Sequence, residues 1–164
     1  MITVKLDATD STNALLKNLM LSEKLEDFTI VTANQQLNGR GQMGSKWESE
    51  AGKNLTFSVL KYFKNYHIKE QFLLNIIISL AVYNTLEKIF IPNLYVKWPN
   101  DIMSGNFKIC GILIENNLKN YLIKYSIIGI GLNVNQLELR NLDKASSLKK
   151  NMCKTIDIDE LLTS

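Results

Sequence analysis

Three short segments of the chain carry residue types and spacings that could bind a ligand. The first, residues 39–44, reads Gly-Arg-Gly-Gln-Met-Gly. Successive backbone amides in such a segment can surround an anion, and the guanidinium of Arg40 suits a phosphate or a carboxylate. No Gly-Lys-Ser/Thr follows, which excludes the phosphate-binding loop of nucleotide hydrolases. No strand–helix–strand unit follows either, which excludes a dinucleotide fingerprint. The alternative interpretation is a flexible surface loop.

The second segment, residues 97–101, reads Lys-Trp-Pro-Asn-Asp and follows an apolar run that predicts a strand. A cation, an amide and a carboxylate therefore lie close together at one strand end. Asp101 could bind magnesium, and Asn100 could bind an amine or hydroxyl of a ligand. A tight turn is the alternative, because Pro-Asn-Asp is an ordinary composition for one.

The third segment, residues 127–134, alternates apolar side chains with Gly129, Gly131 and Asn133. Side chains alternate between the two faces of a strand, so these three residues share one face and the apolar residues share the other. Glycine weakens a strand and often marks the close approach of a ligand or another backbone. The pattern predicts a core-facing apolar side and a bare backbone floor. A packing contact against another element is the alternative.

The elements that would position these segments predict an α+β fold with a mixed, mainly antiparallel sheet and helices packed on it. A helix is predicted after the N-cap residues 10–12, and a second, apolar on nearly all sides and so expected to be largely buried, spans residues 69–90. From Gln136 the chain is polar and is predicted to be irregular, with a helix beginning at 158–162. Strands are predicted at 3–6, 28–33, 55–60, 94–98, 108–115 and 121–134.

Composition narrows the class of protein. The 164 residues suit one domain, and a net charge of +3 is too small to argue for nucleic-acid binding. Two cysteines without motif spacing and a single histidine argue against a zinc site or a disulfide framework. The longest apolar stretch, residues 72–83, is short against the ~20 residues that cross a membrane. No apolar signal region is present at the start, so the expectation is a cytoplasmic protein with no membrane partner.

Six motifs in order resemble biotin protein ligases, and the match runs from about Asp10 to Ser147. Any one of the motifs is weak evidence, but the six together are specific, and the Lys-Trp-Pro-Asn-Asp run is the most diagnostic. The motifs are Asp10-Ser11-Thr12-Asn13, Gln36 with Gly39-Arg40-Gly41, Trp47, Lys97-Trp98-Pro99-Asn100-Asp101, Lys108 with Gly111-Ile112-Leu113, and Gly131-Leu132-Asn133.

The resemblance implies a fold like the catalytic core of class II aminoacyl-tRNA synthetases, and it implies roles for single residues. The loop 39–44 would close over biotin and its adenylate. Arg40 and Lys108 would be the catalytic cations that contact the reacting carboxylate and the phosphate. The implied biotin-binding residues are Ser11, Thr12, Asn13, Gln36, Gly39, Arg40, Lys108 and Gly111.

For the nucleotide, the resemblance implies contacts from Arg40, Trp47, Asn100, Asp101 and Asn133, with Asp101 also the candidate magnesium ligand. The roles implied for Lys108 and Gly111 conflict with the geometry of a regular strand. Lys108 and Gly111 are three residues apart, so they face opposite sides of a regular strand. If both contact the ligand, a bulge or a backbone contact must bring them together.

The implied function is an ATP-dependent ligase that forms biotinyl-5'-AMP and transfers biotin to a lysine of a biotin carboxyl carrier protein. ATP with Mg²⁺ would be the co-substrate, and no tightly bound cofactor is expected. A lipoate–protein ligase and a biotin-binding module without full turnover are the alternatives. Members of the family often pair through a sheet edge, so a homodimer is a further expectation.

The chain departs from the family pattern in two places. Some members carry arginine at the loop positions that are Gln42 and Met43 here, so retention of the adenylate is expected to be weaker. The second departure concerns the ends. Residues 1–164 are expected to be a catalytic domain without a preceding DNA-binding helix-turn-helix, and without the C-terminal helix and β-barrel of relatives.

Overall fold

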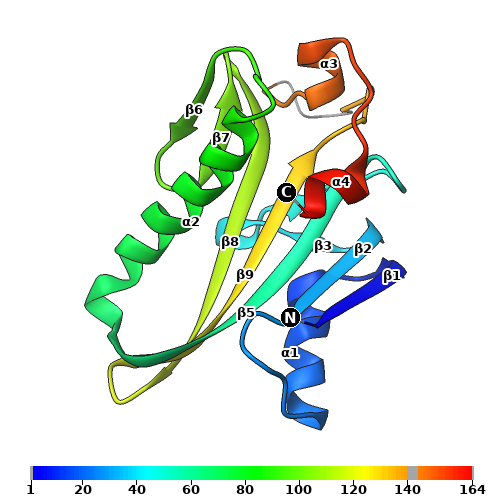
Figure 1. Cartoon of the computed structure of the whole chain (residues 1–164). Coiled ribbons are helices and arrows are strands. Elements are labelled where there is room, and N and C mark those ends of the chain that lie inside the picture. The colour runs from blue at the N-terminus through cyan, green and yellow to red at the C-terminus, as the bar shows by residue number, and fades with distance from the viewer. Residues whose placement is uncertain (1, 140–143, 164) are drawn as a thin grey trace.

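The computed structural model describes residues 2–139 and 144–163 and shows a curved seven-stranded sheet with helices on both faces (Figure 1). The strand order is β1-β2-β5-β9-β8-β7-β6. β1 pairs in parallel with β2, and the other neighbours are antiparallel. The mixed, mainly antiparallel α+β architecture expected from the sequence is therefore confirmed.

The sheet strands are β1 (Thr3–Thr9), β2 (Ile30–Gln36), β5 (Asn54–His67), β6 (Leu94–Lys97), β7 (Asp101–Ser104), β8 (Phe107–Lys119) and β9 (Leu122–Asn133). A separate two-stranded ribbon contains β3 (Gly39–Arg40) and β4 (Lys46–Trp47), joined by the 3₁₀ turn η1 (Gln42–Gly44). The helices are α1 (Thr12–Ser22), η2 (Ile68–Glu70), α2 (Gln71–Glu87), α3 (Leu148–Met152) and α4 (Ile158–Thr163).

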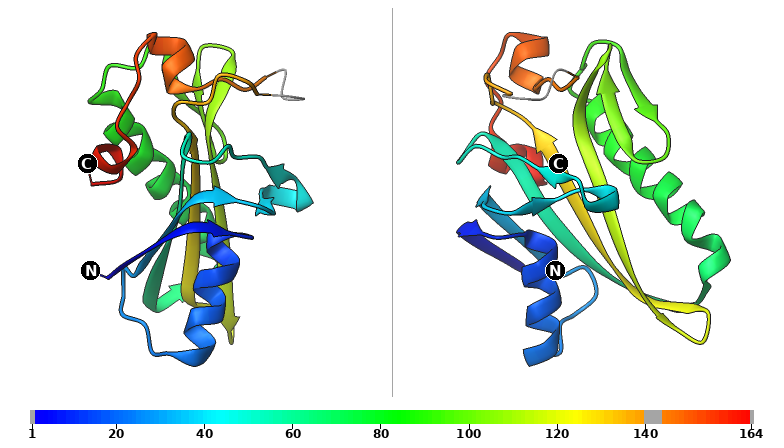
Figure 2. Two further views of the ribbon diagram at one scale, coloured as in Figure 1. Left: turned by 90° about the vertical axis from the view of Figure 1, so that its right-hand side faces the viewer. Right: turned by 180° about the vertical axis from the view of Figure 1, so that it is seen from behind.

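Different elements cover the two faces of the sheet (Figure 2). α2 and α4 lie on one face, and α1 and the β3–β4 ribbon lie on the other. Each face has its own apolar core. Leu55, Ile102 and Leu132 belong to the core on the α2 side, while Leu16 and Ile127 belong to the core under α1. The chemistry-bearing segments are therefore separated from the larger core by the thickness of one sheet.

Strand alternation explains which residues face which side. Ile128 and Ile130 in β9 line an apolar groove of about 550 Å³ between the sheet and α2, as the predicted apolar side of this strand requires. Gly129 and Gly131 line a cavity on the opposite face. The two-faced reading of β9 is confirmed.

The burial predicted for the second helix is wrong. In α2 only Leu74, Ser79 and Leu86 are buried, while Leu73, Ile77 and Leu80 remain 50%, 57% and 49% exposed. The helix packs against a single sheet face, so only one side of its apolar surface is covered. An apolar surface on all sides of a helix shows which residues could be buried, but the number of elements packed against the helix determines how many of them are buried.

Some predicted strand ends, and the predicted absence of structure in the tail, are also wrong. β5 continues to His67, far past the predicted end at residue 60, and the short strand β7 was not predicted. The tail after Gln136 was expected to be irregular, yet it contains α3 as well as the predicted start of α4. Its loop is ordered by Asn135, whose amide bonds both the N–H and the C=O of Ile156 at 3.0 and 2.8 Å. Residues 140–143 of this tail lie outside the described residues.

No helix within the described ranges 2–139 and 144–163 is both long and apolar enough to cross a membrane.

Candidate active site

The three segments singled out in the sequence meet on the α1 face of the sheet, around a cavity of about 260 Å³. The β3–β4 ribbon closes one side, α1 the second and the start of β7 the third. The predicted site residues that line this cavity are Ser11, Asn13, Arg40, Trp47, Asn100, Asp101, Lys108 and Gly111. Segments that are far apart in the chain therefore line one cavity.

The floor of the cavity is bare backbone, as the glycine alternation in β9 predicts. A Cβ atom on Gly129 would lie 2.4 Å from Oδ1 of Asn13, and one on Gly131 would lie 2.4 to 2.8 Å from the indole of Trp47. Real Cβ atoms do not approach this closely, so any side chain at these positions would displace its neighbour. The glycines let α1 and the ribbon approach the sheet.

A β-bulge explains how Lys108 and Gly111 reach the same cavity. In the pairing of β7 with β8, Met103 lies opposite Lys108 while Ile102 lies opposite Cys110, so Ile109 is an extra residue. The extra residue shifts the alternation by one and turns Lys108 onto the glycine face. The backbone of Lys108 is also held by the tail, through bonds to Lys144 O (2.8 Å) and from Ser146 N (2.9 Å).

The ammonium of Lys108 has an acidic partner and an aromatic neighbour. Its Nζ lies 2.7 Å from Oδ1 of Asp101 and 5.8 Å from the ring centroid of Trp47. The indole N–H of Trp47 is buried and has no hydrogen-bond partner among the described residues. A buried donor without an acceptor beside an ammonium group is suited to an anionic ligand, which would accept from both.

Asn100 follows a cis peptide bond between Trp98 and Pro99 and is buried. Its Nδ2 donates to the carbonyl of Ile112 at 2.8 Å, and its own carbonyl accepts from Ile112 N at 3.1 Å. These bonds tie the second predicted segment to β8 next to Gly111. The side-chain oxygen of Asn100 is the atom left for other partners.

A chain of polar contacts lies behind the α1 side of the cavity, which Ser11 and Asn13 line. Gln36 Oε1 accepts from both the backbone N–H of Thr12 (2.8 Å) and its hydroxyl (3.1 Å). Ser58 Oγ lies 2.7 Å from the Thr12 hydroxyl and 2.6 Å from Oδ1 of Asn13. The N-cap residue Ser11 makes no capping bond with its side chain and lines the cavity instead.

Gln36 and Gly39 line a neighbouring hollow of about 830 Å³ under the ribbon, which Arg40, Trp47 and Glu115 also border. Asn133, in contrast, is buried outside both. Its oxygen accepts from Asn54 at 2.9 Å, and its Nδ2 donates to the carbonyl of Ser146 at 3.1 Å. The structure therefore brings every predicted site residue except Thr12 and Asn133 to the surface of these two hollows.

Sequence reasoning missed two residues that join the polar network, Ser58 and Glu115. Asn13 Nδ2 donates to Glu115 at 2.7 Å, and Arg40 Nη2 lies 3.5 Å from the same carboxylate oxygen. Alternation could have found both. Glu115 is four residues after Gly111 on the same strand face, and Ser58 continues the polar alternation Asn54, Thr56, Ser58 at the start of β5.

The charge around the cavity is mainly positive. Arg40, Lys46 and Lys108 line it, against Asp101 as the acidic residue of the lining. Within the ranges 2–139 and 144–163 no group of three His, Cys, Asp or Glu side chains could hold a metal ion. Burial raises the pKa of the Cys110 thiol to about 12, so this thiol, next to the site, stays protonated at neutral pH. The arrangement is suited to binding a ligand with a neutral polar end and an anionic end.

Comparison with known proteins agrees with this arrangement. The model of the biotin/lipoate A/B protein ligase family matches residues 6–133. The biotin–[acetyl-CoA-carboxylase] ligase of Paracoccus denitrificans is 34% identical over 128 residues, which are 77% of this chain and 52% of the relative. The bifunctional ligase/repressor BirA of Bacillus subtilis is 33% identical over 108 residues, 66% of this chain and 33% of the relative. The chain therefore spans about half or less of these relatives.

Among solved structures, the biotin protein ligase of Aquifex aeolicus in complex with biotin and ATP superposes with a TM-score of 0.82 at 32% identity. The superposition covers 99% of this chain and 66% of that one.

Proposed function

The chain belongs to the biotin/lipoate A/B protein ligase family, and on that premise we propose that it activates biotin with ATP to biotinyl-5'-AMP and transfers the biotinyl group to a lysine of a biotin carboxyl carrier protein. The observation that carries the proposal is the two-ended cavity. A neutral hydrogen-bonding end and a cationic end lie on one glycine floor under one ribbon. Biotin has a ureido ring at one end and a carboxylate at the other.

In this proposal the neutral end binds the ureido ring through polar side chains and the loop backbone. Such groups can satisfy both the donors and the acceptor of a cyclic urea. The buried network around Ser58 holds these side chains in place, because each of its close contacts lies between 2.6 and 3.1 Å. The residues assigned to biotin are Ser11, Asn13, Gln36, Gly39 and Gly111, with Arg40 and Lys108 at the carboxylate. Thr12, buried outside both hollows, is assigned to hold Gln36 and Ser58 in place.

The cationic end is proposed to align the reacting groups. The biotin carboxylate is itself the nucleophile, so the first step needs no side-chain base. Its oxygen attacks the α-phosphorus of ATP, a C(O)O–P bond forms, and the bond to pyrophosphate breaks. Charge builds on the phosphoryl oxygens, and Lys108 and Arg40 are the cations that can stabilise it. The fixed position of Lys108 on its bulge supplies the preorganisation that this step requires.

The nucleotide is assigned to Trp47, Asn100 and Asp101, together with Arg40, while Asn133, which is buried outside the cavity, is assigned only a supporting role through its bonds to Asn54 and Ser146. Magnesium is proposed to enter with ATP. Asp101 is the carboxylate of the cavity lining, and its Oδ1 is already paired with Lys108. Mg²⁺ commonly uses one or two protein carboxylates together with substrate phosphates, so a single free carboxylate oxygen fits an ion carried by ATP. When bound, the ion would neutralise phosphate charge.

In the second step the amine of a carrier lysine attacks the carbonyl carbon of the mixed anhydride. The C–N bond forms, the C–O bond to AMP breaks, and AMP leaves with the electron pair. The attacking lysine must first lose a proton. Asp101 is the proposed acceptor, because it lies at the cavity wall beside the expected anhydride. This chemistry uses cytoplasmic ATP, so the cytoplasm is the proposed location. A homodimer through a sheet edge, β1 or β6, also stays a prediction.

A single-turnover assay with ATP labelled at the α-phosphate tests the function. Biotin should produce a labelled adenylate, and a purified biotin carboxyl carrier domain should then discharge it to AMP. Lipoate and octanoate serve as competing acids, because neither has the hydrogen-bonding groups of a ureido ring, so each leaves the polar end unsatisfied. Adenylate formation with lipoate but not biotin would reassign the substrate. An adenylate that the carrier never discharges would restrict the chain to the first half-reaction.

A further inference from the structure

Glu115 connects two parts of the site that the chain otherwise keeps separate. It lies on β8, on the same face as Gly111 and Leu113, and its side chain is 35% exposed. Its Oε2 accepts a hydrogen bond from Asn13 Nδ2 at 2.7 Å, and the same oxygen lies 3.5 Å from Nη2 of Arg40. Asn13 belongs to the first turn of α1, and Arg40 belongs to the ribbon over the cavity. One anion therefore contacts both walls.

The orientation of the Asn13 amide depends on Glu115. The oxygen of this amide lies 2.6 Å from Ser58 Oγ, and the nitrogen lies 2.7 Å from the carboxylate. A hydroxyl can donate or accept, so Ser58 would tolerate either orientation of the amide. A carboxylate only accepts, so a flipped amide would bring two oxygens together at Glu115. Glu115, and not Ser58, therefore decides which atom of Asn13 faces β8.

The orientation also sets the direction of the buried network. Because Asn13 Oδ1 can only accept, the single proton of Ser58 must point to it. The Thr12 hydroxyl, 2.7 Å from Ser58 Oγ, then faces an oxygen that has no proton left to donate. The Thr12 hydroxyl has one proton and two possible acceptors for it, Gln36 Oε1 at 3.1 Å and Ser58 Oγ. The part of the network that Glu115 directs therefore runs from Ser58 through Asn13 to Glu115. Glu115 is the terminal acceptor of this chain, which lies next to the cavity wall.

We propose that Glu115 is a positioning residue for the neutral end of the ligand: it fixes the amide nitrogen of Asn13 so that its second N–H is available to a ligand carbonyl, such as that of a cyclic urea. The inference rests on the proposed function, since it takes biotin as the ligand. Asn13 lines the cavity, which puts its amide within reach of the ligand. The Arg40 contact, at 3.5 Å between partly exposed groups, is a weaker link and is not required for this role.

Two substitutions separate the acceptor role from the charge. Glu115→Gln keeps an oxygen that can accept from Asn13 but loses the charge toward Arg40. Glu115→Leu keeps approximate size and removes the acceptor. Biotin affinity is measured by calorimetry on the whole chain. Glu115→Leu should raise the Kd for biotin at least about tenfold, the scale of one unsatisfied hydrogen bond, while Glu115→Gln should stay within about threefold of the original chain.

Further measurements make the test specific to positioning. Dethiobiotin, which keeps the ureido ring, should lose affinity by the same factor as biotin. The rate of adenylate formation at saturating biotin should change less than about threefold in both variants, because Glu115 does not contact the reacting atoms. Glu23→Leu, an exposed carboxylate at the end of α1, is the matched control and should leave the Kd unchanged.

The side-chain amide of Asn13 gives a readout that needs no ligand. Its N–H protons, followed by NMR, should lose their downfield shift and exchange protection in Glu115→Leu and keep them in Glu115→Gln. Equal biotin affinity in the Leu variant, or a Gln variant as impaired as the Leu variant, would overturn the inference. Failure of the unmodified chain to form an adenylate would count against the proposed function alone, since the amide signals would still decide whether Glu115 orients Asn13.

Discussion

The Nζ of Lys108 lies 2.7 Å from the carboxylate of Asp101. Lys108 belongs to β8, and the β-bulge in the pairing of β8 with β7 turns its side chain toward the glycine floor. The pair faces each other across neighbouring strands β8 and β7, and the side chains are 35% and 25% exposed. Both groups are therefore partly desolvated at the wall where the proposed reaction takes place. The bulge sets the face of the sheet on which the Lys108 side chain lies, and the ion pair with Asp101 fixes the position of its ammonium group.

Replacing Lys108 with methionine should slow adenylate formation by ~10²- to 10³-fold, the effect of removing one preorganised donor from a developing charge. Biotin should still bind, with a Kd raised by less than the rate falls, because the polar end of the cavity is untouched. Rapid-quench measurement of labelled adenylate at saturating biotin and ATP checks the rate, and calorimetry checks the affinity. A rate within threefold of the original would remove Lys108 from the catalytic assignment.

The contact between Gly131 and Trp47 predicts a second result. Gly131→Ala would place a Cβ within 2.4 to 2.8 Å of the indole, and β9 is paired on both sides, so the indole must move. The chain has two tryptophans, and Trp98 is 70% exposed. In a Trp98→Phe background, the fluorescence of Trp47 should shift to longer wavelength in Gly131→Ala as the ring becomes solvated.

Ligand affinity should fall together with this fluorescence change. An unchanged emission maximum with normal folding by circular dichroism would show that the strand yields and the indole does not. The position of Trp47 over the floor would then be less constrained than the structure indicates.

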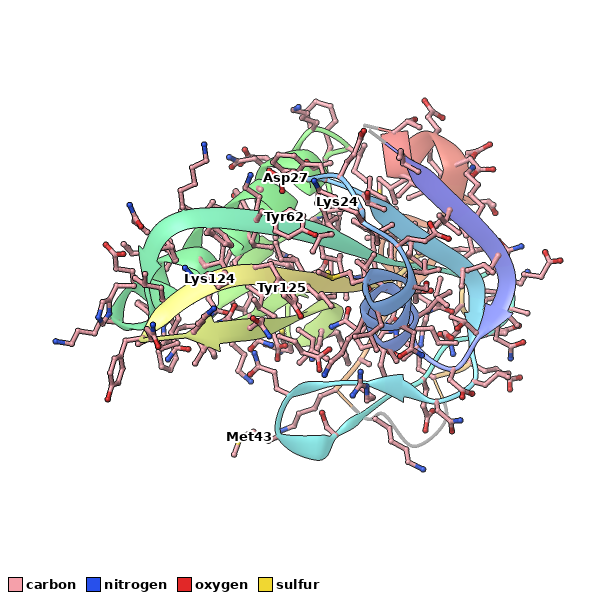
Figure 3. All side chains as sticks on the ribbon, turned by 90° about the horizontal axis from the view of Figure 1, so that it is seen from below. Lys24, Asp27, Met43, Tyr62, Lys124 and Tyr125 are labelled. Atoms are coloured by element: carbon pink, nitrogen blue, oxygen red, sulfur yellow. The ribbon has the colours of Figure 1, made fainter. Side chains whose placement is uncertain are left out.

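Gln42 and Met43 can be told apart as sites for a restored cation. Gln42 lines the cavity, whereas Met43 is fully exposed and, in Figure 3, points outward from the tip of the turn that joins β3 and β4. Gln42→Arg should slow the loss of biotinyl-adenylate by about threefold to tenfold, in line with one added charge-assisted hydrogen bond to the phosphate. The measurement is release of labelled adenylate by filter binding after dilution. Met43→Arg is the matched control and should release the adenylate at the original rate; equal slowing in both variants would point to general charge attraction.

The two cysteines should differ in reactivity. Cys110 is buried with its thiol pKa raised to about 12 by burial, whereas Cys153 is exposed. A thiol reagent at pH 8 should therefore label one group in the folded chain and two in denaturant. Mass spectrometry after tryptic digestion assigns the label. Rapid modification of Cys110 in the folded chain would mean that the core around it opens easily.

The same thiol predicts a sign for the pH dependence of stability. Its ordinary pKa is 9.0, and the folded value is higher, so above pH 9 the unfolded chain has lost a proton that the folded chain keeps. Stability contributed by the buried neutral thiol is therefore present below pH 9 and decreases as the pH rises from about 9 to about 12. Burial also raises the pKa of Tyr62 and Tyr66, which act in the same direction. Cys110→Val should reduce this alkaline decrease without abolishing it, as measured by urea unfolding across that range.

Much of the site followed from local pattern. The alternation of Gly129 and Gly131 with isoleucines predicted the floor and its apolar reverse side, and both are present. The glycine-rich loop and the Lys-Trp-Pro-Asn-Asp run predicted segments that the structure brings to the same cavity. These predictions succeed because side-chain direction along a strand, and the closeness with which glycine lets another group approach, are properties of the neighbouring residues alone.

Other features depended on partners far away in the chain. Burial of α2 was overestimated, because the number of elements packed against a helix is not encoded in its own apolar pattern. The extra residue Ile109, which turns Lys108 toward the cavity, arises from the pairing of β8 with β7. Glu115 lies 102 residues from Asn13 and 75 from Arg40 in the sequence, and only the assembled sheet brings the three together. The sequence by itself determined which residues could contact a ligand, through local geometry. The tertiary structure decided which of them hold one another in place, because hydrogen-bond partners and strand register are set by contacts between distant segments.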